Sequence, residues 1–429
     1  MNRRTFLATG AAALAGAARG QVEGAKVLAP GERVRLAVIG VGGQGKDDLK
    51  RAAYYGHEIV ALCDADLRIA DAAFRQFPDA KQYQDYRVML DEMGDKIDGV
   101  IIATPDHHHF PASMAALRHG KHVYCEKPLT HSIWEARELA AEAKTSGVAT
   151  QMGNTGQASN SWREISEYIR AGAIGEVREV HVWTNRPIWP QGIDRPAGDE
   201  KPHDELNWDL WLGPAPERPF NDAYHPFRWR GWMDFGTGAI GDMACHELHP
   251  VFKVLDLGFP ESAEATSTAV NKETFPHAST VRYEFPSRGA WPALTLYWYD
   301  GGMKPFRPRF IEDTVELESE GTLYVGSEGA ILEGKLLPEA KFASYPKPPE
   351  TLPRSIGHWE EWFAAIKGEK VAPGSNFGFA GFLTESVLLG NVAIRAGRKL
   401  HWDGAAMRVT NYDEANALLK REYRAGWVS

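Results

Sequence analysis

The pattern of apolar and polar positions divides the chain into two regions. In the first, short apolar runs alternate with stretches of helical periodicity, which is typical of a parallel sheet covered by helices on both faces. We therefore expect a doubly wound α/β domain over residues 33–155. The pattern predicts strands at 34–39, 58–63, 99–103, 122–125 and 148–152, and helices at 45–55, 69–76, 111–119 and 132–146.

The second region has a different period. Extended segments follow one another without intervening helices, which predicts an α+β domain over residues 156–429 with a largely antiparallel open sheet. The predicted strands are 176–184, 262–271, 279–285, 294–299, 314–318, 321–325 and 330–332, and the predicted helices are 161–171, 377–396 and 412–424.

A long segment rich in tryptophan and proline, residues 186–235, interrupts the second region. Loops of this length inside a compact domain are uncommon and are usually functional. We therefore expect this segment to form part of a site or to face a partner.

The N-terminus begins Asn2-Arg3-Arg4-Thr5-Phe6-Leu7 and continues as an alanine-rich, weakly apolar stretch. We interpret residues 1–20 as a twin-arginine signal peptide, so we expect export in the folded state, to the periplasm or the medium. The stretch is shorter than the roughly 20 residues that span a bilayer, so we expect no stable membrane anchor. The chain has only three cysteines, an odd number that disfavours a disulfide framework.

Charge and aromatic content narrow the class of ligand. The formal net charge of the 429 residues is -9 at pH 7. A surface of that sign repels phosphate backbones, so we expect no nucleic acid partner. The 14 tryptophans suit stacking on sugar-like ligands, but ordinary core packing accounts for tryptophan equally well.

A glycine-rich turn follows the first predicted strand and opens the first predicted helix. Its sequence fits the pattern G-x-G-x-x-G. In a Rossmann domain the first glycine permits the tight turn, the second lets a pyrophosphate approach the backbone, and the third allows helix and strand to pack closely. Unpaired amides at the helix N-terminus then face the phosphates. The predicted dinucleotide-binding residues of this turn are Gly40, Gly42, Gly43, Gln44 and Gly45.

Asp64 stands at the end of the second predicted strand, nineteen residues after Gly45. A carboxylate there can accept hydrogen bonds from both ribose hydroxyls and repels a 2′-phosphate. The sequence therefore predicts NAD as the cofactor, with NADP less favoured, although Arg68 nearby would tolerate NADP.

Three further motifs follow the glycine turn: Thr104-Pro105-Asp106-His107-His108, Glu126-Lys127-Pro128 and Gly241-Asp242-Met243-Ala244-Cys245-His246. With these motifs in this order, the chain resembles the Gfo/Idh/MocA oxidoreductases from about Val34 to the C-terminus. The resemblance implies that Lys127 lies beside the nicotinamide and the substrate hydroxyls, and that Asp242 and His246 form a proton-transfer dyad. By the same resemblance, the cofactor is bordered by Thr104, Pro105, His107, Glu126 and Lys127.

The residue types suit that chemistry. Residues four apart lie on one face of an α-helix, so Asp242 can hold the imidazole of His246 in one tautomer and stabilise its protonated form. Histidine titrates near pH ~6.5 and can take a hydroxyl proton as hydride leaves the same carbon. Lysine, with a reference pKa of ~10.4, is a poor base but can donate hydrogen bonds to a developing alkoxide. A purely structural role for these ion pairs is the alternative.

A metal site is a further alternative. Asp242, His246 and His249 stand at i, i+4 and i+7, and two histidines with a carboxylate can bind iron or zinc. The histidines are three residues apart, not the four of a zincin motif, so we predict no metal.

These features predict an NAD-dependent oxidoreductase that acts on a hydroxyl of a sugar, glycoside or cyclitol. Because free dinucleotide is not expected outside the cytoplasm, we expect the cofactor to be held through turnover. A redox-neutral NAD-dependent glycosidase and a noncatalytic dinucleotide-binding scaffold are the two alternatives. The motif Trp208-Asp209-Leu210-Trp211-Leu212-Gly213-Pro214 is typical of the exported sugar-active branch of the family, and the resemblance implies a homodimer or homotetramer.

Overall fold

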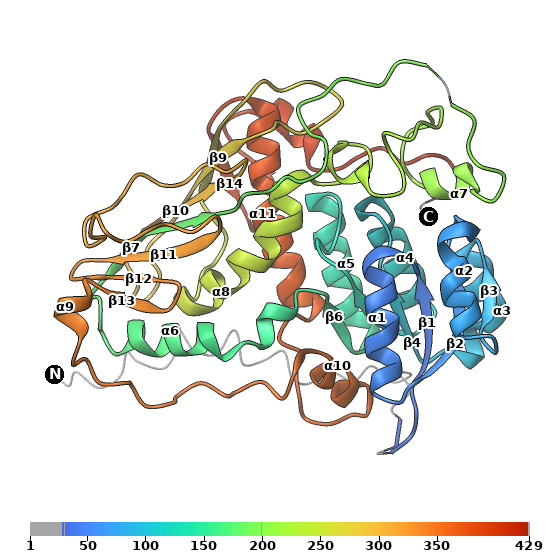
Figure 1. The fold of residues 1–429 in the computed structure, drawn as a ribbon, viewed down its shortest axis with the longest axis horizontal. Helices are drawn as coiled ribbons and strands as arrows, with labels where there is room; N and C mark the ends of the chain where they lie inside the picture. Colours follow the sequence, from blue (N-terminus) through green and yellow to red (C-terminus); the bar gives the residue numbers. More distant parts are fainter. Residues whose placement is uncertain (1–27, 30, 199, 428–429) are drawn as a thin grey trace.

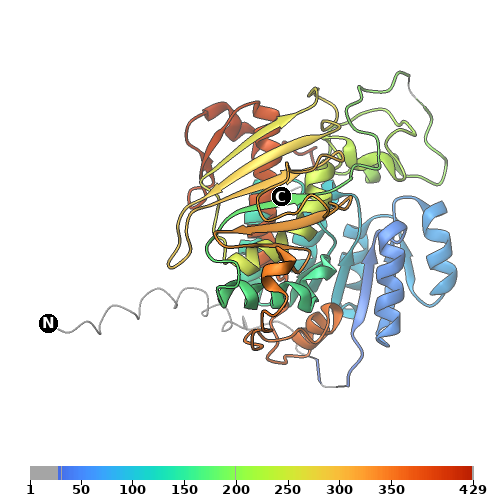
Figure 2. The same ribbon diagram turned by 60° about the vertical axis from the view of Figure 1, so that its left-hand side comes forward.

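The computed structural model describes residues 28–427, except residues 30 and 199. The predicted signal peptide, residues 1–20, lies outside the described residues. Two domains stand side by side in Figure 1, with the parallel sheet of the first domain at the right and the larger sheet of the second at the left. Figure 2 turns the molecule so that the larger sheet comes forward.

The first domain is built on a six-stranded sheet in which neighbouring strands are all parallel. The order is β3-β2-β1-β4-β5-β6, so the direction of winding reverses between β1 and β4. The predicted doubly wound sheet is confirmed, with the unpredicted strand β3 at one edge. The strands are β1 (Arg35–Ile39), β2 (Glu58–Cys63), β3 (Lys81–Tyr83), β4 (Gly99–Ile102), β5 (His122–Cys125) and β6 (Thr150–Met152).

The sequence prediction placed the start of one helix of this domain at Pro111, but α4 begins at Asp106 and contains Pro111. Proline has no N–H, so it leaves the carbonyl four residues earlier without its helical donor. That carbonyl, of His107, accepts a hydrogen bond from Nη2 of Arg421 at 2.5 Å, which compensates for the missing donor. The helices are α1 (Gly43–Tyr54), α2 (Leu67–Gln76), α3 (Tyr86–Met93), α4 (Asp106–Arg118) and α5 (Ile133–Ser146).

The second domain contains a nine-stranded sheet with the order β13-β12-β11-β7-β10-β9-β8-β14-β15. Only β7 and β10 pair in parallel, so the largely antiparallel sheet is confirmed. The strands are β7 (Val177–Trp183), β8 (Ser262–Ser267), β9 (Ser279–Phe285), β10 (Leu294–Tyr299), β11 (Gly321–Gly326), β12 (Ala330–Leu332), β13 (Lys335–Leu337), β14 (Leu400–Asp403) and β15 (Arg408–Val409).

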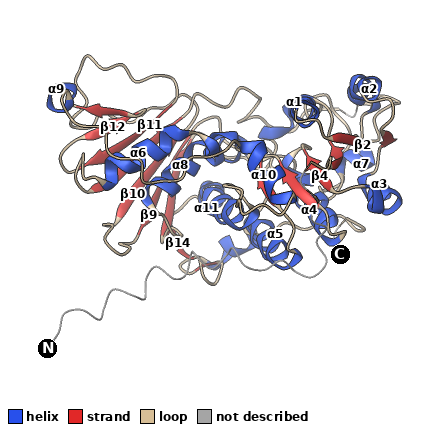
Figure 3. Cartoon of the chain, turned by 90° about the horizontal axis from the view of Figure 1, so that it is seen from below, coloured by secondary structure: helices blue, strands red, loops and turns tan. Residues whose placement is uncertain are grey.

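Three long helices, α6, α8 and α11, lie against one face of this sheet (Figure 3). Helix α11 also packs against α5 of the first domain, and so joins the two domains. Among the described residues it is the one helix long and apolar enough to cross a membrane, and 83% of its apolar window is buried in the protein. The helices are α6 (Asn160–Arg170), α7 (Trp208–Leu212), α8 (Cys245–Leu255), α9 (Glu339–Phe342), α10 (His358–Ile366) and α11 (Phe377–Ala396).

Two predicted elements are wrong. Residues 314–318 do not form a strand, because side chains rather than a neighbouring strand bind their carbonyls: Lys304 donates to Leu317 and Arg307 to Val315. The helix predicted at 412–424 is reduced to a 3-10 helix over Asp413–Leu418. After Leu418, side-chain hydrogen bonds to other parts of the protein hold the chain in a non-helical conformation.

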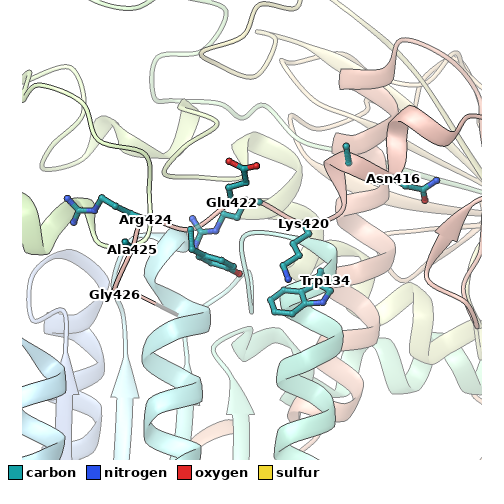
Figure 4. Close-up of a pocket in the computed structure, with 10 residues that line it drawn as sticks. Trp134, Asn416, Lys420, Glu422, Arg424, Ala425 and Gly426 are labelled. Atoms are coloured by element: carbon teal, nitrogen blue, oxygen red, sulfur yellow. The ribbon is translucent and has the colours of Figure 1, made fainter. Parts of the chain in front are cut away.

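Residues 419–427, here called the C-terminal strap, run from the second domain across helices of the first (Figure 4). A surface cavity of about 710 Å³ lies along the strap, where Nζ of Lys420 is 3.7 Å from the ring centre of Trp134. Farther on, Arg424 donates to Asp209 and Gly213 beside α7. The strap therefore ties α7 of the second domain to the first domain.

Glu135 anchors the strap and also caps helix α5. One carboxylate oxygen accepts the backbone N–H groups of His131 (3.0 Å) and Ser132 (2.9 Å). The other accepts Nε of Arg421 at 2.8 Å and the hydroxyl of Tyr423 at 2.6 Å. The side chain is fully buried, so no water can replace these four donors.

We expect Glu135→Ala to lower the free energy of unfolding by about 3–5 kcal/mol, because it leaves a buried guanidinium unpaired. Glu135→Gln retains acceptor oxygen for the cap and should cost less. Glu138→Ala, at an exposed position of the same helix, is the control and should cost under about 0.5 kcal/mol. Urea unfolding measures all three, and equal losses for Glu135→Ala and Glu138→Ala would contradict the double role.

Candidate active site

A cavity of about 620 Å³ opens at the carboxyl edge of the first sheet, near the point where the winding reverses. This is the position at which doubly wound sheets bind ligands. The structure brings most of the predicted cofactor residues to this cavity. Its wall includes Gly40, Gly42, Gly43, Gln44, Asp64, Thr104, Pro105, Glu126 and Lys127.

The turn requires glycines because neighbouring backbone and side-chain atoms lie where a Cβ would be. Gly40 has a φ of 81°, and a Cβ there would lie 2.6 Å from the carbonyl oxygen of Ala103. A Cβ on Gly42 would lie 2.1 Å from Cγ2 of Ile69 on helix α2. Gly45 is not part of the cavity wall. A Cβ there would lie 1.9 Å from the carbonyl oxygen of Gly40, so this glycine serves the packing of α1 on the turn.

Asp64 closes one end of the cavity, directly after β2. Its carboxylate accepts the backbone N–H groups of Val41 and Asp66, each at 3.0 Å. Burial raises the pKa of Asp64, and the two backbone hydrogen bonds oppose that rise. The hydrogen bonds orient the carboxylate beside the glycine turn, as recognition of a ribose requires.

His107, which the sequence predicted to border the cofactor, is not part of the cavity wall, whereas its neighbour His108 is. The ring of His107 is fully buried between the domains, with Nδ1 3.1 Å from the carbonyl oxygen of Phe235 and Nε2 2.9 Å from that of Trp211. Burial lowers the pKa of His107 well below its usual range. Motif position alone could not distinguish the two adjacent histidines.

The outer wall of the cavity is formed by residues 203–235 of the second domain, here called the cover segment. Sequence reasoning marked this stretch as functional but assigned none of its wall residues to the cofactor site, among them Trp211, His225, Trp229 and Arg230. The tryptophan and proline content of the segment was the feature of the sequence that marked it as functional. Those aromatic residues give the cover segment an apolar core of its own, which includes Leu206, Trp211, Phe220, Tyr224, Trp232 and Phe235.

The cover segment is fastened to the first domain beside Asp64. The backbone N–H of Asn207 donates to the carbonyl of Ala65 at 2.9 Å, and that of Leu67 donates to Glu205 at 3.1 Å. Nε2 of His225 lies 3.0 Å from Oδ2 of Asp66, and both side chains are buried. A ligand in the cavity is therefore enclosed by both domains.

At the opposite end of the cavity, Lys127 contacts the second domain. Its Nζ donates to Oδ1 of Asp242 at 2.8 Å, and Nε of Arg230 pairs with the same oxygen at 3.2 Å. Burial alone would raise the pKa of Asp242, but the two cations outweigh that effect and lower it to about 2. Asp242 is therefore ionised at neutral pH.

The sequence predicted that Asp242 holds the imidazole of the proton-transfer residue His246, but no described hydrogen bond joins the two side chains. Asp242 pairs with Lys127 and Arg230 instead. The physical reason is local. Asp242 lies in a π-helical turn, Ile240–Ala244, and His246 lies in α8, so the regular spacing of an α-helix does not apply between them. Burial and the nearby charge of Lys127 lower the pKa of His246 to about 3, while the negative charge of Asp242 opposes this decrease.

Glu126 lies beneath Lys127 and is buried. Burial raises its pKa to about 7, while the positive charge of Lys127 opposes the rise. Asp48 of α1, which sequence reasoning missed, is also buried, and burial and the charge of Glu126 raise its pKa well above the usual range. A Cβ on Gly153 would lie 2.2 Å from the Glu126 carboxylate, so Gly153 leaves room for that side chain.

Within the described residues, no group of three or more His, Cys, Asp or Glu side chains is arranged to hold a metal ion. His249 is buried, with Nδ1 2.9 Å from Nδ2 of Asn154.

Comparison with known proteins identifies the class. A model of the oxidoreductase family's NAD-binding Rossmann fold matches residues 34–154, and a model of its C-terminal alpha/beta domain matches residues 188–429. The protein is thus a two-domain NAD-binding oxidoreductase. It belongs to the Gfo/Idh/MocA family.

Individual relatives match over part of the chain. Inositol 2-dehydrogenase of Salmonella typhimurium is 31% identical over 34% of this chain and 45% of its own. D-glucoside 3-dehydrogenase of Escherichia coli is 30% identical over 37% of this chain and 45% of its own. The matched region therefore spans less than half the length of these relatives.

Solved structures share the fold over most of the chain. The WlbA dehydrogenase from Bordetella pertussis, in complex with NADH and UDP-GlcNAcA, is 16% identical with a TM-score of 0.60, over 87% of this chain and 99% of that one. The aldose-aldose oxidoreductase from Caulobacter crescentus is 17% identical with a TM-score of 0.56, over 86% of this chain and 100% of that one.

The contact between Gly42 and Ile69 yields a test of the glycine turn. We expect Gly42→Ala to weaken NAD binding at least about 10-fold, because the new Cβ displaces helix α2 and also occupies the approach of the pyrophosphate. Adding Ile69→Ala removes the clashing methyl group and should restore stability but not NAD affinity. Thermal unfolding and NAD titration report the two effects, with Ile69→Ala alone as the control. Full recovery of affinity in the double variant would show that Gly42 serves packing only.

Proposed function

We propose that the protein oxidises a secondary or anomeric hydroxyl of a sugar, glycoside or cyclitol with an NAD that stays bound through turnover. The observation that carries this proposal is the buried Lys127–Asp242 ion pair at the inner end of the dinucleotide cavity, with a neutral histidine beside it. Such a site can hold a hydroxyl and remove its proton.

The cavity fits a dinucleotide. The glycine turn leaves open the space that a Cβ would fill, and the hydroxyl of Thr104 is buried in the wall without a hydrogen-bond partner. The Asp64 carboxylate at the other end favours NAD over NADP, because it would repel a 2′-phosphate. When bound, NAD supplies the carbon that accepts a hydride.

The chain's own residues handle the proton. Lys127, held by an ionised Asp242, donates a hydrogen bond to the substrate oxygen and stabilises the negative charge that develops there. His246 is neutral at physiological pH and has no hydrogen bond to a described residue, so a ring nitrogen is available to accept the hydroxyl proton. The relatives named for inositol 2-dehydrogenase and D-glucoside 3-dehydrogenase activity support a polyhydroxylated substrate.

Retention of the cofactor is supported by the fastening of the cover segment. It is attached by His225 and two backbone hydrogen bonds at one end and by Arg230 at the other. Release of a bound dinucleotide requires these contacts to break or the cover segment to deform. Export in the folded state by the twin-arginine route, and assembly as a homodimer or homotetramer, belong to the same proposal and rest on the N-terminal sequence and the family resemblance.

The proposal is tested on purified protein without added cofactor. We expect heat denaturation to release close to one NAD per chain, and mass spectrometry to detect a ketosugar or lactone after incubation with a panel of sugars, cyclitols and glycosides. Release of free aglycone without an acceptor would favour a redox-neutral glycosidase. NAD without any product across the panel would favour a noncatalytic scaffold.

Lys127→Met and His246→Ala are expected to lower turnover by about 10²–10⁴-fold, because they remove the donor to the developing alkoxide and the proton acceptor. Both variants should still fold and carry NAD, since the glycine turn and Asp64 are intact. Lys96→Met and His119→Ala, at exposed or half-exposed positions of the first domain, are the controls. Near-normal rates for either site variant, per bound NAD, would refute its assigned role.

A further inference from the structure

Arg230 joins the two domains at the end of the cavity where Lys127 lies. Its Nη1 donates to Oδ1 of Asp106 at 3.0 Å, and its Nε pairs with Oδ1 of Asp242 at 3.2 Å. The side chains of Arg230 and Asp242 are 17% and 8% exposed, and that of Asp106 is fully buried. One guanidinium therefore serves two carboxylates with little water around them.

Charges of opposite sign alternate through this part of the site. The first domain contributes Lys127 and Asp106, and the second contributes Asp242 and Arg230. We call these four residues the charge chain. Asp106 is fixed in turn by the backbone N–H of Thr237 at 3.0 Å and by its hydroxyl at 2.6 Å.

Aromatic rings hold Arg230 in place. Its guanidinium carbon lies 4.3 Å from the ring centre of Trp229 and 5.5 Å from that of Trp189. These faces attract a cation and exclude water from it. The residue sits in a short 3-10 helix of the cover segment, Arg228–Gly231, so its position depends on the cover segment being docked.

Lys127 and Arg230 both contact the same oxygen of Asp242, Oδ1, while no described hydrogen bond involves Oδ2. Two cations on one oxygen keep the carboxylate ionised, because protonation would weaken both ion pairs. They also fix its orientation. A carboxylate held in this way fixes the position of the Lys127 ammonium.

We propose that Arg230 is a positioning residue that fixes Asp242 as a carboxylate, so that Asp242 holds the Lys127 ammonium in place while His246 takes the proton of the substrate hydroxyl. This inference rests on the proposed function and adds a residue that acts through Asp242.

Removing the guanidinium would change the balance of charge. Asp242 would then be left with one cation, Lys127, and the carboxyl of Glu126 also acts on Asp242. The imidazole of His246 is the other titratable group facing Asp242 and is neutral. The loss of one of two cations must raise the pKa of Asp242 and weaken its hold on the Lys127 ammonium.

The first test does not depend on catalysis. In protein labelled with ¹³C at the aspartate carboxyl, the Asp242 signal is identified by its loss in Asp242→Asn. We expect no titration of this signal above about pH 4 in the wild type, and a midpoint at least about one pH unit higher in Arg230→Met. Arg230→Lys should titrate between the two. An unchanged midpoint in Arg230→Met would overturn the proposal. Should Arg230→Met fail to fold, Arg230→Gln, which also lacks the charge, gives the same reading.

The second test uses turnover per bound NAD. We expect Arg230→Met to lower kcat about 100-fold while KM for the sugar changes less than about 3-fold, and to move the acid limb of the pH–rate profile upward. Arg230→Lys should recover about tenfold in kcat. Arg228→Met removes an exposed arginine from the same short helix and should leave kcat and the acid limb unchanged.

A purely structural role for Arg230 would lower the yield of NAD-loaded protein without moving the acid limb, and that result would reject the assignment. If the wild type oxidises no sugar, the proposed function fails, and the carboxyl titration still decides the role of Arg230.

Discussion

The geometry of the site depends on one electrostatic constraint: two buried carboxylates, one from each domain, share a single guanidinium. Asp106 opens helix α4 of the first domain and Asp242 lies in the π-helical turn of the second, and Arg230 contacts both. A buried charge that loses its partner costs about 3–5 kcal/mol, so separation of the domains at this point is strongly disfavoured. The position of Lys127 relative to the second domain follows from the same contacts, because Lys127 shares an oxygen of Asp242 with Arg230.

The rest of the cavity is closed by parts of the chain that are distant in sequence. The cover segment has its own aromatic core and meets the first domain at Asp66, while the C-terminal strap ties its helix α7 back to the first domain. The strap also supplies the donor that Pro111 lacks, through Arg421. A bound dinucleotide would thus be enclosed by contacts whose loss costs stability, and this links the stability of the fold to retention of the cofactor.

The sequence predicted the layers of the fold, and most of the residues it assigned to the cofactor line one cavity, because both depend on local patterns. Apolar runs indicate parallel strands, and the glycine turn with Asp64 lies within one βαβ unit, so spacing alone defines its geometry. The partners of Asp242 could not be predicted in this way. Asp242 and His246 have the spacing of a helical pair, yet a π-helical turn lies between them and the carboxylate pairs with Arg230, whose position depends on how the cover segment folds. The positions of His107 and His108 have the same origin: the carbonyl of Trp211 contacts both rings, and the carbonyl of Phe235 contacts that of His107.

The two cations of the charge chain explain how one small site can contain an ionised acid and a neutral base. Burial opposes charge on both Asp242 and His246. The positive field of Lys127 and Arg230 reverses that effect for the carboxylate and reinforces it for the imidazole, so the two groups take opposite protonation states at the same pH. The same field stabilises any negative charge that forms on an oxygen beside Lys127. A site with this polarity stabilises an oxyanion, because the negative charge forms next to a cation that is already in place.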